Sequence, residues 1–502
     1  MIRVFHRKCG QMSQMANLIW GFCLLCSVFL FQGCLKSTYY GVRETPENIP
    51  RTYGDIQLGE GSVAERWWEV YGDNALNEAL EKALDNSLTL KATYFRILQS
   101  QTQIEQSKSG YWPTASFSAG AGYGGSVSAE ENTHQPSFSM GLNVGYEIDI
   151  WGAVGAEARV NELGYYAAKD AAESAILSLT SNFVQAWFNV RYYRARRELI
   201  TNLLALSEQY LELAKEHYKS GQATGMDVLE QEEQVRSMRV TLANLDMNEK
   251  LATHQLSQLA GGFEVIQVPE GLKGLPELPE LSGIPSPEKL LERRPDIRSA
   301  YRSAQQMDAR VVIALADRLP TLKLSTSLNL KSPSLIDLFS QLAWNLAANF
   351  AATLFDGFRG SAALTRAKLS FLESETSYGV TVMNAIYEVE SALLKYQQSL
   401  LDLENSRIEM EQSAKLLETS QVYYIGGLLD YNRVLSMLRS HVNSSMAYLE
   451  AQNTVLKNQI AVFVAMGGTW MSDRVEKGEQ NAREILENTE KGSRIEEGKE
   501  EK

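Results

Sequence analysis

Two stretches of 67 residues without proline, 153–219 and 358–424, most constrain the fold of this chain. Proline costs about 3 kcal/mol inside a helix, so its absence over such lengths indicates helices. At 1.5 Å per residue each helix would be about 100 Å long, several times the usual length. Shorter proline-free runs at 76–111, 225–262 and 430–466 predict further helices. Apolar residues recur along the long runs at spacings of three and four, which is typical of a coiled-coil seam.

The two halves of the chain match each other at an offset of about 206 residues. The turn sequence Tyr218–Gly221, for example, recurs as Tyr424–Gly427. Several such anchors in the same order predict two internal structural repeats, 67–262 and 288–470. The segment between them, 263–287, contains five prolines and suits an extended linker.

Four stretches alternate apolar residues with polar or small ones, which predicts strands with one apolar and one wet face. Their length suits tilted membrane strands, although a soluble antiparallel sheet would alternate as well. Four strands cannot close a barrel, because the smallest membrane barrels have about eight, and lipid does not tolerate an open sheet edge. Two copies of the chain would give eight strands and three would give twelve; the small and polar inward residues favour the wetter, twelve-stranded barrel. The predicted strands are 114–125, 137–150, 321–331 and 342–354.

The N-terminus resembles a bacterial secretion signal. A basic start is followed by an apolar stretch, Leu18–Phe31, that is too short to span a bilayer as a helix. Cys34 comes three residues later, directly after a glycine, as in a lipobox. We therefore predict a signal peptide over 1–33, a covalent lipid on Cys34 and a tether over 34–66; an ordinary signal peptide with an incidental cysteine is the alternative.

Charge and composition argue against several functions. The formal net charge is -13, whereas a nucleic-acid partner usually requires a basic surface. The five histidines have no metal-binding spacing, and no nucleophile motif occurs. We therefore expect no enzyme activity, no metal and no cofactor other than the lipid on Cys34. The tail 471–502 is rich in charge and poor in apolar residues, which predicts a disordered segment.

Four short motifs resemble one known family, the TolC/OprM outer-membrane efflux factors, and in particular its lipid-anchored, NodT-like members. The resemblance covers about 67–470. The motifs are an opening Trp67-Trp68, a strand-to-helix signature at Tyr146–Gly152, a helix start at Leu291–Ile297 and a closing Met466–Trp470.

The resemblance implies a mixed α and β membrane protein: a homotrimer whose twelve-stranded transmembrane β-barrel continues as a periplasmic α-helical coiled-coil tunnel. It implies a passive channel of a tripartite efflux system in the outer membrane, served by a periplasmic membrane fusion (adaptor) protein and an inner-membrane RND-type pump. A type I protein secretion duct, or a periplasmic coiled-coil scaffold without a pore, is the alternative. The turns that hold Tyr218 and Gly221, and Tyr424 and Gly427, would lie at the closed tip and dock the adaptor, although glycine also ends helices.

The family gate often has acidic residues shortly after these glycines. Asp227 matches in the first repeat, whereas the second repeat has Arg433 and Ser436 at the matching positions, with Asp430 just before them. We hypothesise that Asp227 and Arg433, directly or through water, form a lock that holds the tip shut; two unrelated surface charges are the alternative. Asp430 is the third gate candidate.

Overall fold

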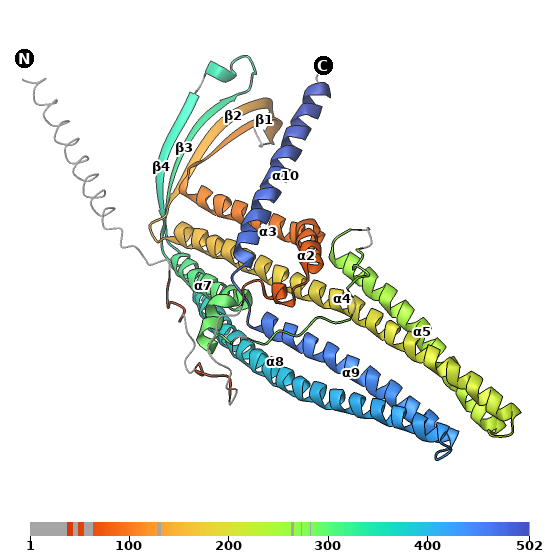
Figure 1. Ribbon diagram of the computed structural model, residues 1–502. Coiled ribbons are helices and arrows are strands. Elements are labelled where there is room, and N and C mark those ends of the chain that lie inside the picture. Colours follow the sequence, from red (N-terminus) through yellow and green to blue (C-terminus); the bar gives the residue numbers. More distant parts are fainter. Residues whose placement is uncertain are drawn as a thin grey trace, which may run out of the picture. The chain divides into compact units, whose positions relative to one another are not determined.

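The computed structural model describes eight segments of the chain (Figure 1). They form two compact units, each described here by itself. The sheet unit contains 100–165, 302–376 and the described part of 1–42; the helical unit contains 166–301, 377–502 and the described part of 43–99. The described residues are 38–43, 49–54, 64–127, 132–262, 266–272, 274–281, 283–340 and 342–500.

Four antiparallel strands in the order β1-β2-β3-β4 form the sheet of the sheet unit (Figure 1). Its middle pair, β2 and β3, joins the first half of the chain to the second. Within the described residues, β1 and β4 each have a strand on one side only, so both edges of the sheet are open. The strands are β1 (Thr114–Val127), β2 (Asn132–Ile148), β3 (Thr321–Ser332) and β4 (Leu342–Ala351).

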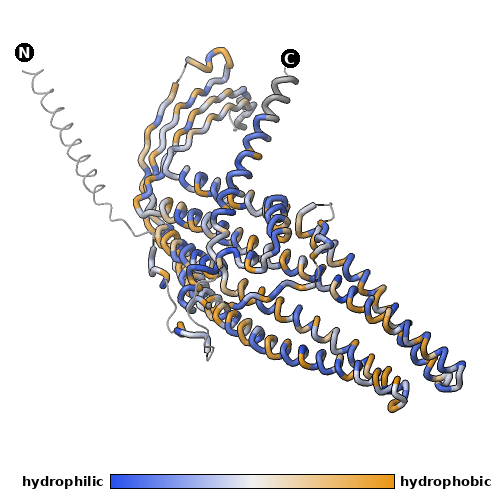
Figure 2. Tube along the Cα trace, viewed as in Figure 1, coloured by the Kyte–Doolittle hydropathy of each residue, from blue (hydrophilic) through white to orange (hydrophobic). Residues whose placement is uncertain are grey.

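The register of the sheet places residues of one kind in rows across all four strands. Residues opposite each other in the register share a face of the sheet. Figure 2 shows apolar and polar residues alternating along the strands. The salt bridge between Lys323 and Glu147, with nitrogen and oxygen 3.0 Å apart, lies between residues paired in the register. One row is apolar: Phe117, Leu142, Leu328 and Trp344. Another is polar: Ser116, Asn143, Ser327 and Asn345.

The order helix, two strands, long helix, shorter helix occurs twice along the chain. Both long helices have 67 residues and both that follow have 35. Within the described residues, no helix combines the length and apolar character that crossing a membrane requires. The first half has α3 (Leu88–Lys108), α4 (Ala153–Lys219) and α5 (Gly225–Leu259), and the second has α7 (Pro295–Ala316), α8 (Arg359–Ile425) and α9 (Tyr431–Ala465). Short turns of helix are η1 (Trp67–Tyr71), η2 (Ser109–Tyr111), η3 (Pro287–Lys289), α6 (Leu290–Arg293) and η4 (Leu338–Ser340).

The single helix predicted over 76–111 is in fact two, because α2 (Asn74–Asn86) precedes α3. The backbone leaves the helical region at Ser87, where φ is -54° and ψ is 117°. The Ser87 hydroxyl then accepts a hydrogen bond from the Leu90 amide at 3.4 Å. Serine suits this position because its side chain can cap the helix that follows.

The core of the helical unit has two main parts. One is formed by apolar side chains of α4, α5, α8 and α9, among them Leu203, Met238 and Leu438. The other is aromatic: the Trp67 ring stacks on Phe463 and Trp68 packs edge-on against Trp470, with ring centroids 5.6 and 4.7 Å apart. The opening and closing motifs of the sequence therefore pack against each other, and both have a structural role.

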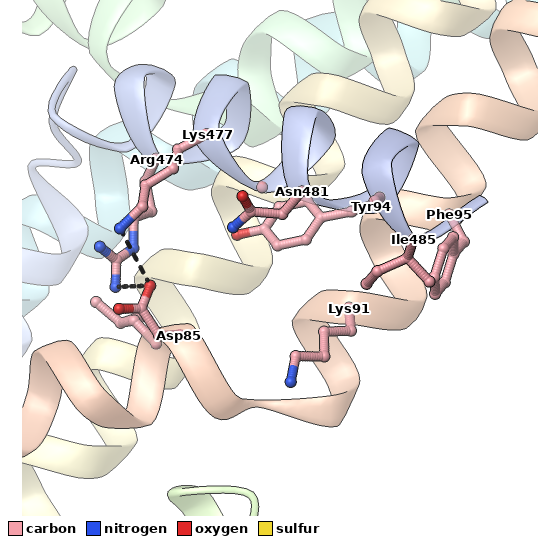
Figure 3. Close-up of a pocket in the computed structure, with 11 residues that line it drawn as sticks. Asp85, Lys91, Tyr94, Phe95, Arg474, Lys477, Asn481 and Ile485 are labelled. Carbon is pink, nitrogen blue, oxygen red and sulfur yellow. Dashed lines mark hydrogen bonds and ion pairs between the residues drawn. The ribbon is translucent and has the colours of Figure 1, made fainter. Parts of the chain in front are cut away.

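The prediction of a disordered tail is wrong for 471–500, which form the helix α10 (Met471–Glu500). Its first half packs with Met471, Val475 and Ala482 buried, at spacings of four and seven that the charged composition hides. Ion pairs hold the same half, and Figure 3 shows Arg474 beside Asp85, with 3.1 Å between nitrogen and oxygen. Periodic burial together with strong helix formers such as Glu, Lys and Arg explains the helix.

Candidate functional site

The turns that end α4 and α8 have the same backbone conformation. In each, the residue after a glycine donates its amide to a carbonyl five residues back, on His217 in the first turn and on Tyr423 in the second, at 2.8 Å in both. Gly221 and Gly427 have φ of +75° and +71°, a region that other residues rarely adopt. These contacts form a Schellman motif, so both predicted turn glycines are required by the backbone.

The charged gate candidates begin the helices that follow the turns. The Asp227 carboxylate accepts the Thr224 amide at 2.7 Å, and the Asp227 amide donates to the Thr224 hydroxyl at 3.3 Å, which is a capping box. In the second repeat Asp430 is itself the cap and accepts the Arg433 amide at 2.8 Å. The acid therefore stands three residues earlier in the second repeat. Because Asp430 caps the helix, no acid is needed at the position that matches Asp227.

The structure does not bring Asp227 and Arg433 into direct contact within one chain. Asp227 is buried, and hydrogen bonds from the Thr224 backbone and from the Asn432 side chain lower its pKa. Arg433 is exposed. No ion pair between the two is found in the described part of a single chain. A lock between them would thus act through water or between neighbouring copies.

An aromatic cluster at the turns joins α8 and α9 to α4. The Tyr424 hydroxyl lies 3.1 Å from Nδ1 of His217, and the Tyr431 hydroxyl donates to the Tyr210 carbonyl at 2.5 Å. Burial raises the pKa of Tyr431. Tyr210 and His217 lie seven residues apart in the first long helix, a coiled-coil spacing, but nothing in the sequence indicates Tyr431 as their partner.

The equivalent tyrosines of the two repeats have different surroundings. Tyr424 is half-buried in the aromatic cluster, whereas Tyr218 is exposed. Large apolar side chains lie exposed around both turns, and Ile425 is 85% exposed. A group of exposed apolar residues indicates a contact surface. The members of this tip surface are Tyr218, Met226, Leu229, Val422, Tyr423, Ile425 and Leu428.

Other predicted features are placed only in part. Cys34, the predicted lipidation site, lies outside the described residues. Among the residues that the structure describes, no group of three or more His, Cys, Asp or Glu side chains is placed to hold a metal ion.

Comparison with known proteins identifies the family. A sequence profile described as outer membrane efflux protein matches 79–262 and 286–468. Pyoverdine export outer membrane protein OpmQ of Pseudomonas aeruginosa is 28% identical over 425 residues, which cover 83% of this chain and 90% of OpmQ. The probable outer membrane lipoprotein SilC of Salmonella typhimurium is 21% identical over 459 residues, or 89% of this chain and 98% of SilC.

The fold resembles the crystal structure of the Campylobacter jejuni CmeC outer membrane channel, with a TM-score of 0.79 at 22% identity over 88% of this chain and 98% of that one. The predicted resemblance is therefore confirmed, and the matched stretches of the profile cover most of the chain. The chain thus belongs to the outer membrane efflux protein family, which makes it an efflux component of the outer membrane.

Proposed function

We propose that three copies of this chain close their sheets into one twelve-stranded barrel, which continues as a helical tunnel and conducts solutes passively. The observation that carries this proposal is the four-stranded sheet with two open edges. Exposed edge groups cannot stay unpaired in lipid, so β1 of one copy would pair with β4 of the next. Such a conduit catalyses no reaction, and it needs no cofactor besides the lipid predicted on Cys34.

The two faces of the sheet support a channel with an apolar exterior. In the apolar row, Phe117 and Trp344 are 65% and 74% exposed in the single chain. The row of serines and asparagines lies on the opposite face. Membrane barrels around an aqueous channel have this arrangement, with apolar residues toward lipid and polar residues inside.

A stripe of exposed apolar residues on α8 supports association between copies. Within this α8 stripe, side chains that are 39–62% exposed recur at three, four and then seven residues. This is the spacing by which helices pack as coiled coils. A neighbouring copy would cover the stripe, which gives the tunnel walls a reason to assemble. The stripe consists of Val380, Met383, Tyr387, Leu394, Leu401 and Ile408.

The tip surface would then dock a periplasmic adaptor protein, which connects the conduit to an inner-membrane pump. Ile425 and Leu428 are 85% and 74% exposed beside the second turn. Docking would bury these apolar groups, and burial of apolar area is favourable at about 25 cal/mol per Å².

Native mass and conductance test the proposal together. The lipoprotein, purified from outer membranes in detergent, is expected to have three times the mass of one chain by native mass spectrometry. In planar bilayers the same preparation should give discrete conductance steps. A monomeric mass together with silent bilayers would contradict the proposal, and a dimeric mass would favour an eight-stranded barrel with a filled interior.

A further inference from the structure

The segment Tyr39–Val42, which begins five residues after Cys34, is bound to α7 through one buried carboxylate. Asp308, on α7, is 1% exposed. Its two oxygens accept the backbone amides of Tyr39, Tyr40 and Gly41 at 3.0, 2.8 and 3.2 Å. No ion pair to Asp308 occurs in the part of the chain that the structure describes. A buried carboxylate is costly without partners, so these three amides are what makes its burial possible.

The backbone of the segment is shaped for this contact. Successive amides that point into one concavity bind an anion, and here the anion belongs to the same chain. Gly41 has φ of +78°, which favours glycine, and a Cβ there would have nothing within 4 Å. The glycine is therefore required by its backbone conformation, since no neighbour crowds the position.

Side chains of the same segment add a second, independent attachment. The Tyr40 ring stacks on Phe371 with 5.2 Å between centroids and 12° between planes. Lys368 lies 5.1 Å from the Tyr39 ring centroid, and Val42 packs against the small core around Phe371. Backbone and side chains thus bind Tyr39–Val42 to α7 and α8 as a unit.

We propose that Asp308 binds the segment after Cys34 and thereby fixes the lipid anchor near the end of the sheet where β3 begins. The proposal rests on the lipid predicted on Cys34 as part of the proposed function. Cys34 precedes Tyr39 by five residues, so even a fully extended chain keeps their Cα atoms within about 18 Å. Asp308 lies eight residues before the end of α7, about 12 Å along the helix, and β3 begins at Thr321.

This attachment of Tyr39–Val42 to Asp308, called the clamp below, restricts where the lipid anchor can lie. Acyl chains bound to a free tether of 34–66 could insert at many places around the protein. With Tyr39–Val42 attached, the Cα atom of Cys34 stays within about 18 Å of that of Tyr39, which limits where the acyl chains can insert. Asp308 is therefore a positioning residue, and its effect on the membrane comes through the segment that it binds.

Release of the lipidated segment by an arginine-specific protease tests the clamp. The full precursor is expressed with an alkyne-bearing fatty acid, and the protein is purified in detergent. Cleavage after Arg43 releases the labelled 34–43 peptide, and this requires the segment to leave Asp308. Because a hydrogen bond to a charged group contributes about 1.5–3 kcal/mol, Asp308→Asn should speed release by about tenfold or more. The matched control is Asp317→Asn, at an exposed acid just after the end of α7, which should leave the rate unchanged.

A second variant and a labelling control keep the outcomes distinct. Gly41→Val strains only the segment and should also speed release, even if Asp308 variants fold poorly. Equal release rates for wild type, Asp308→Asn and Gly41→Val would overturn the clamp. Cys34→Ser should abolish the fatty-acid label. A wild-type protein without the label would overturn the proposal that the clamp positions a lipid anchor. The proposed conduit is tested separately, by native mass and conductance.

Discussion

At the turns, each charged side chain serves its own helix before it can serve a gate. Asp227 closes a capping box with Thr224, and Asp430 caps α9 directly. Replacing such caps by alanine typically costs about 1 kcal/mol. Sequence comparison between the repeats indicates a mismatch of charge at Asp227 and Arg433. It cannot indicate that the acid has moved to the cap, because that depends on where the helix begins.

The lock hypothesis predicts a leakier closed state for Arg433→Ala. Arg433 is exposed and its side chain makes no ion pair with Asp227 within one chain's described residues, so the change should leave the fold intact. Closed-state conductance in planar bilayers is expected to rise, and Arg433→Lys should restore part of the block. The control is Arg439→Ala, on the same helix as Arg433; it removes a weak, half-exposed ion pair between α9 and Glu230 of α5. Unchanged closed-state conductance of Arg433→Ala would contradict the lock.

We expect the Tyr431 hydroxyl to stabilise the turn between α8 and α9. Tyr431→Phe removes one buried hydrogen bond to the Tyr210 carbonyl, which should cost about 1 kcal/mol of the local opening free energy. Amide hydrogen exchange of a peptide spanning 426–435 should therefore be about fivefold faster. Tyr423→Phe, at a side chain that is 49% exposed, provides the control and should leave exchange unchanged. Equal exchange in both variants would show that the hydroxyl contributes little.

At the scale of elements, two sequence patterns predict most of the fold: the absence of proline predicts the helices, and the alternation of apolar with polar residues predicts the strands. The predicted helix 153–219 has the bounds of α4: proline is absent throughout it, and its ends lie beside Gly152 and Gly221, whose φ of +74° and +75° is not helical. The break at Ser87 follows from a cap, and no proline marks it. The α10 helix was missed because its buried positions are diluted by charged neighbours. Contacts between segments far apart in sequence, such as Trp67 with Phe463, leave no mark in local patterns.

Helix α10 should depend on Gly478. A Cβ at this position would lie 2.2 Å from Cζ of Tyr94, and ring atoms of a buried side chain cannot easily retreat. Alanine favours a helix by about 1 kcal/mol over glycine, but overpacking typically costs about 1–3 kcal/mol, so Gly478→Ala should loosen α10. Limited proteolysis at Arg483 is expected to become faster, and Tyr94→Leu should rescue it.

The control for this prediction is Gly164→Ala in α4. A Cβ there meets only the Gln306 side chain at 3.7 Å, an ordinary contact, so cleavage at Arg483 should not change. If Gly478→Ala also leaves cleavage unchanged, the Tyr94 ring adjusts and the packing of α10 does not require glycine.

At the scale of the whole molecule, the sequence predicts the number of strands, and the structure identifies which strands form the edges of the sheet. Four alternating stretches predict a sheet that cannot close by itself. In the part of the chain that the structure describes, β1 and β4 are the strands without a second neighbour. Neither the count nor a single chain fixes the number of copies, because that depends on the tilt and stagger adopted when edges meet. The same holds for the α8 stripe, whose partner is outside the chain.

Disulfide crosslinking between edges tests the shared barrel most directly. No cysteine follows Cys34 in the sequence, so the introduced pairs meet no other thiol in the barrel strands or helices. Ser116→Cys on β1 is combined in turn with cysteine at each of Asn345, Ala347 and Asn349 on β4, since the register between copies is not known in advance. At least one combination should give dimers and trimers on denaturing gels after mild oxidation, with no larger product. As control, Ser139→Cys with Asn143→Cys places both thiols on β2, whose neighbours belong to its own chain, and should give monomers. Monomers in every edge combination would argue against pairing of β1 with β4, whereas a ladder beyond three would indicate an open array, because a closed ring has no edge left to react.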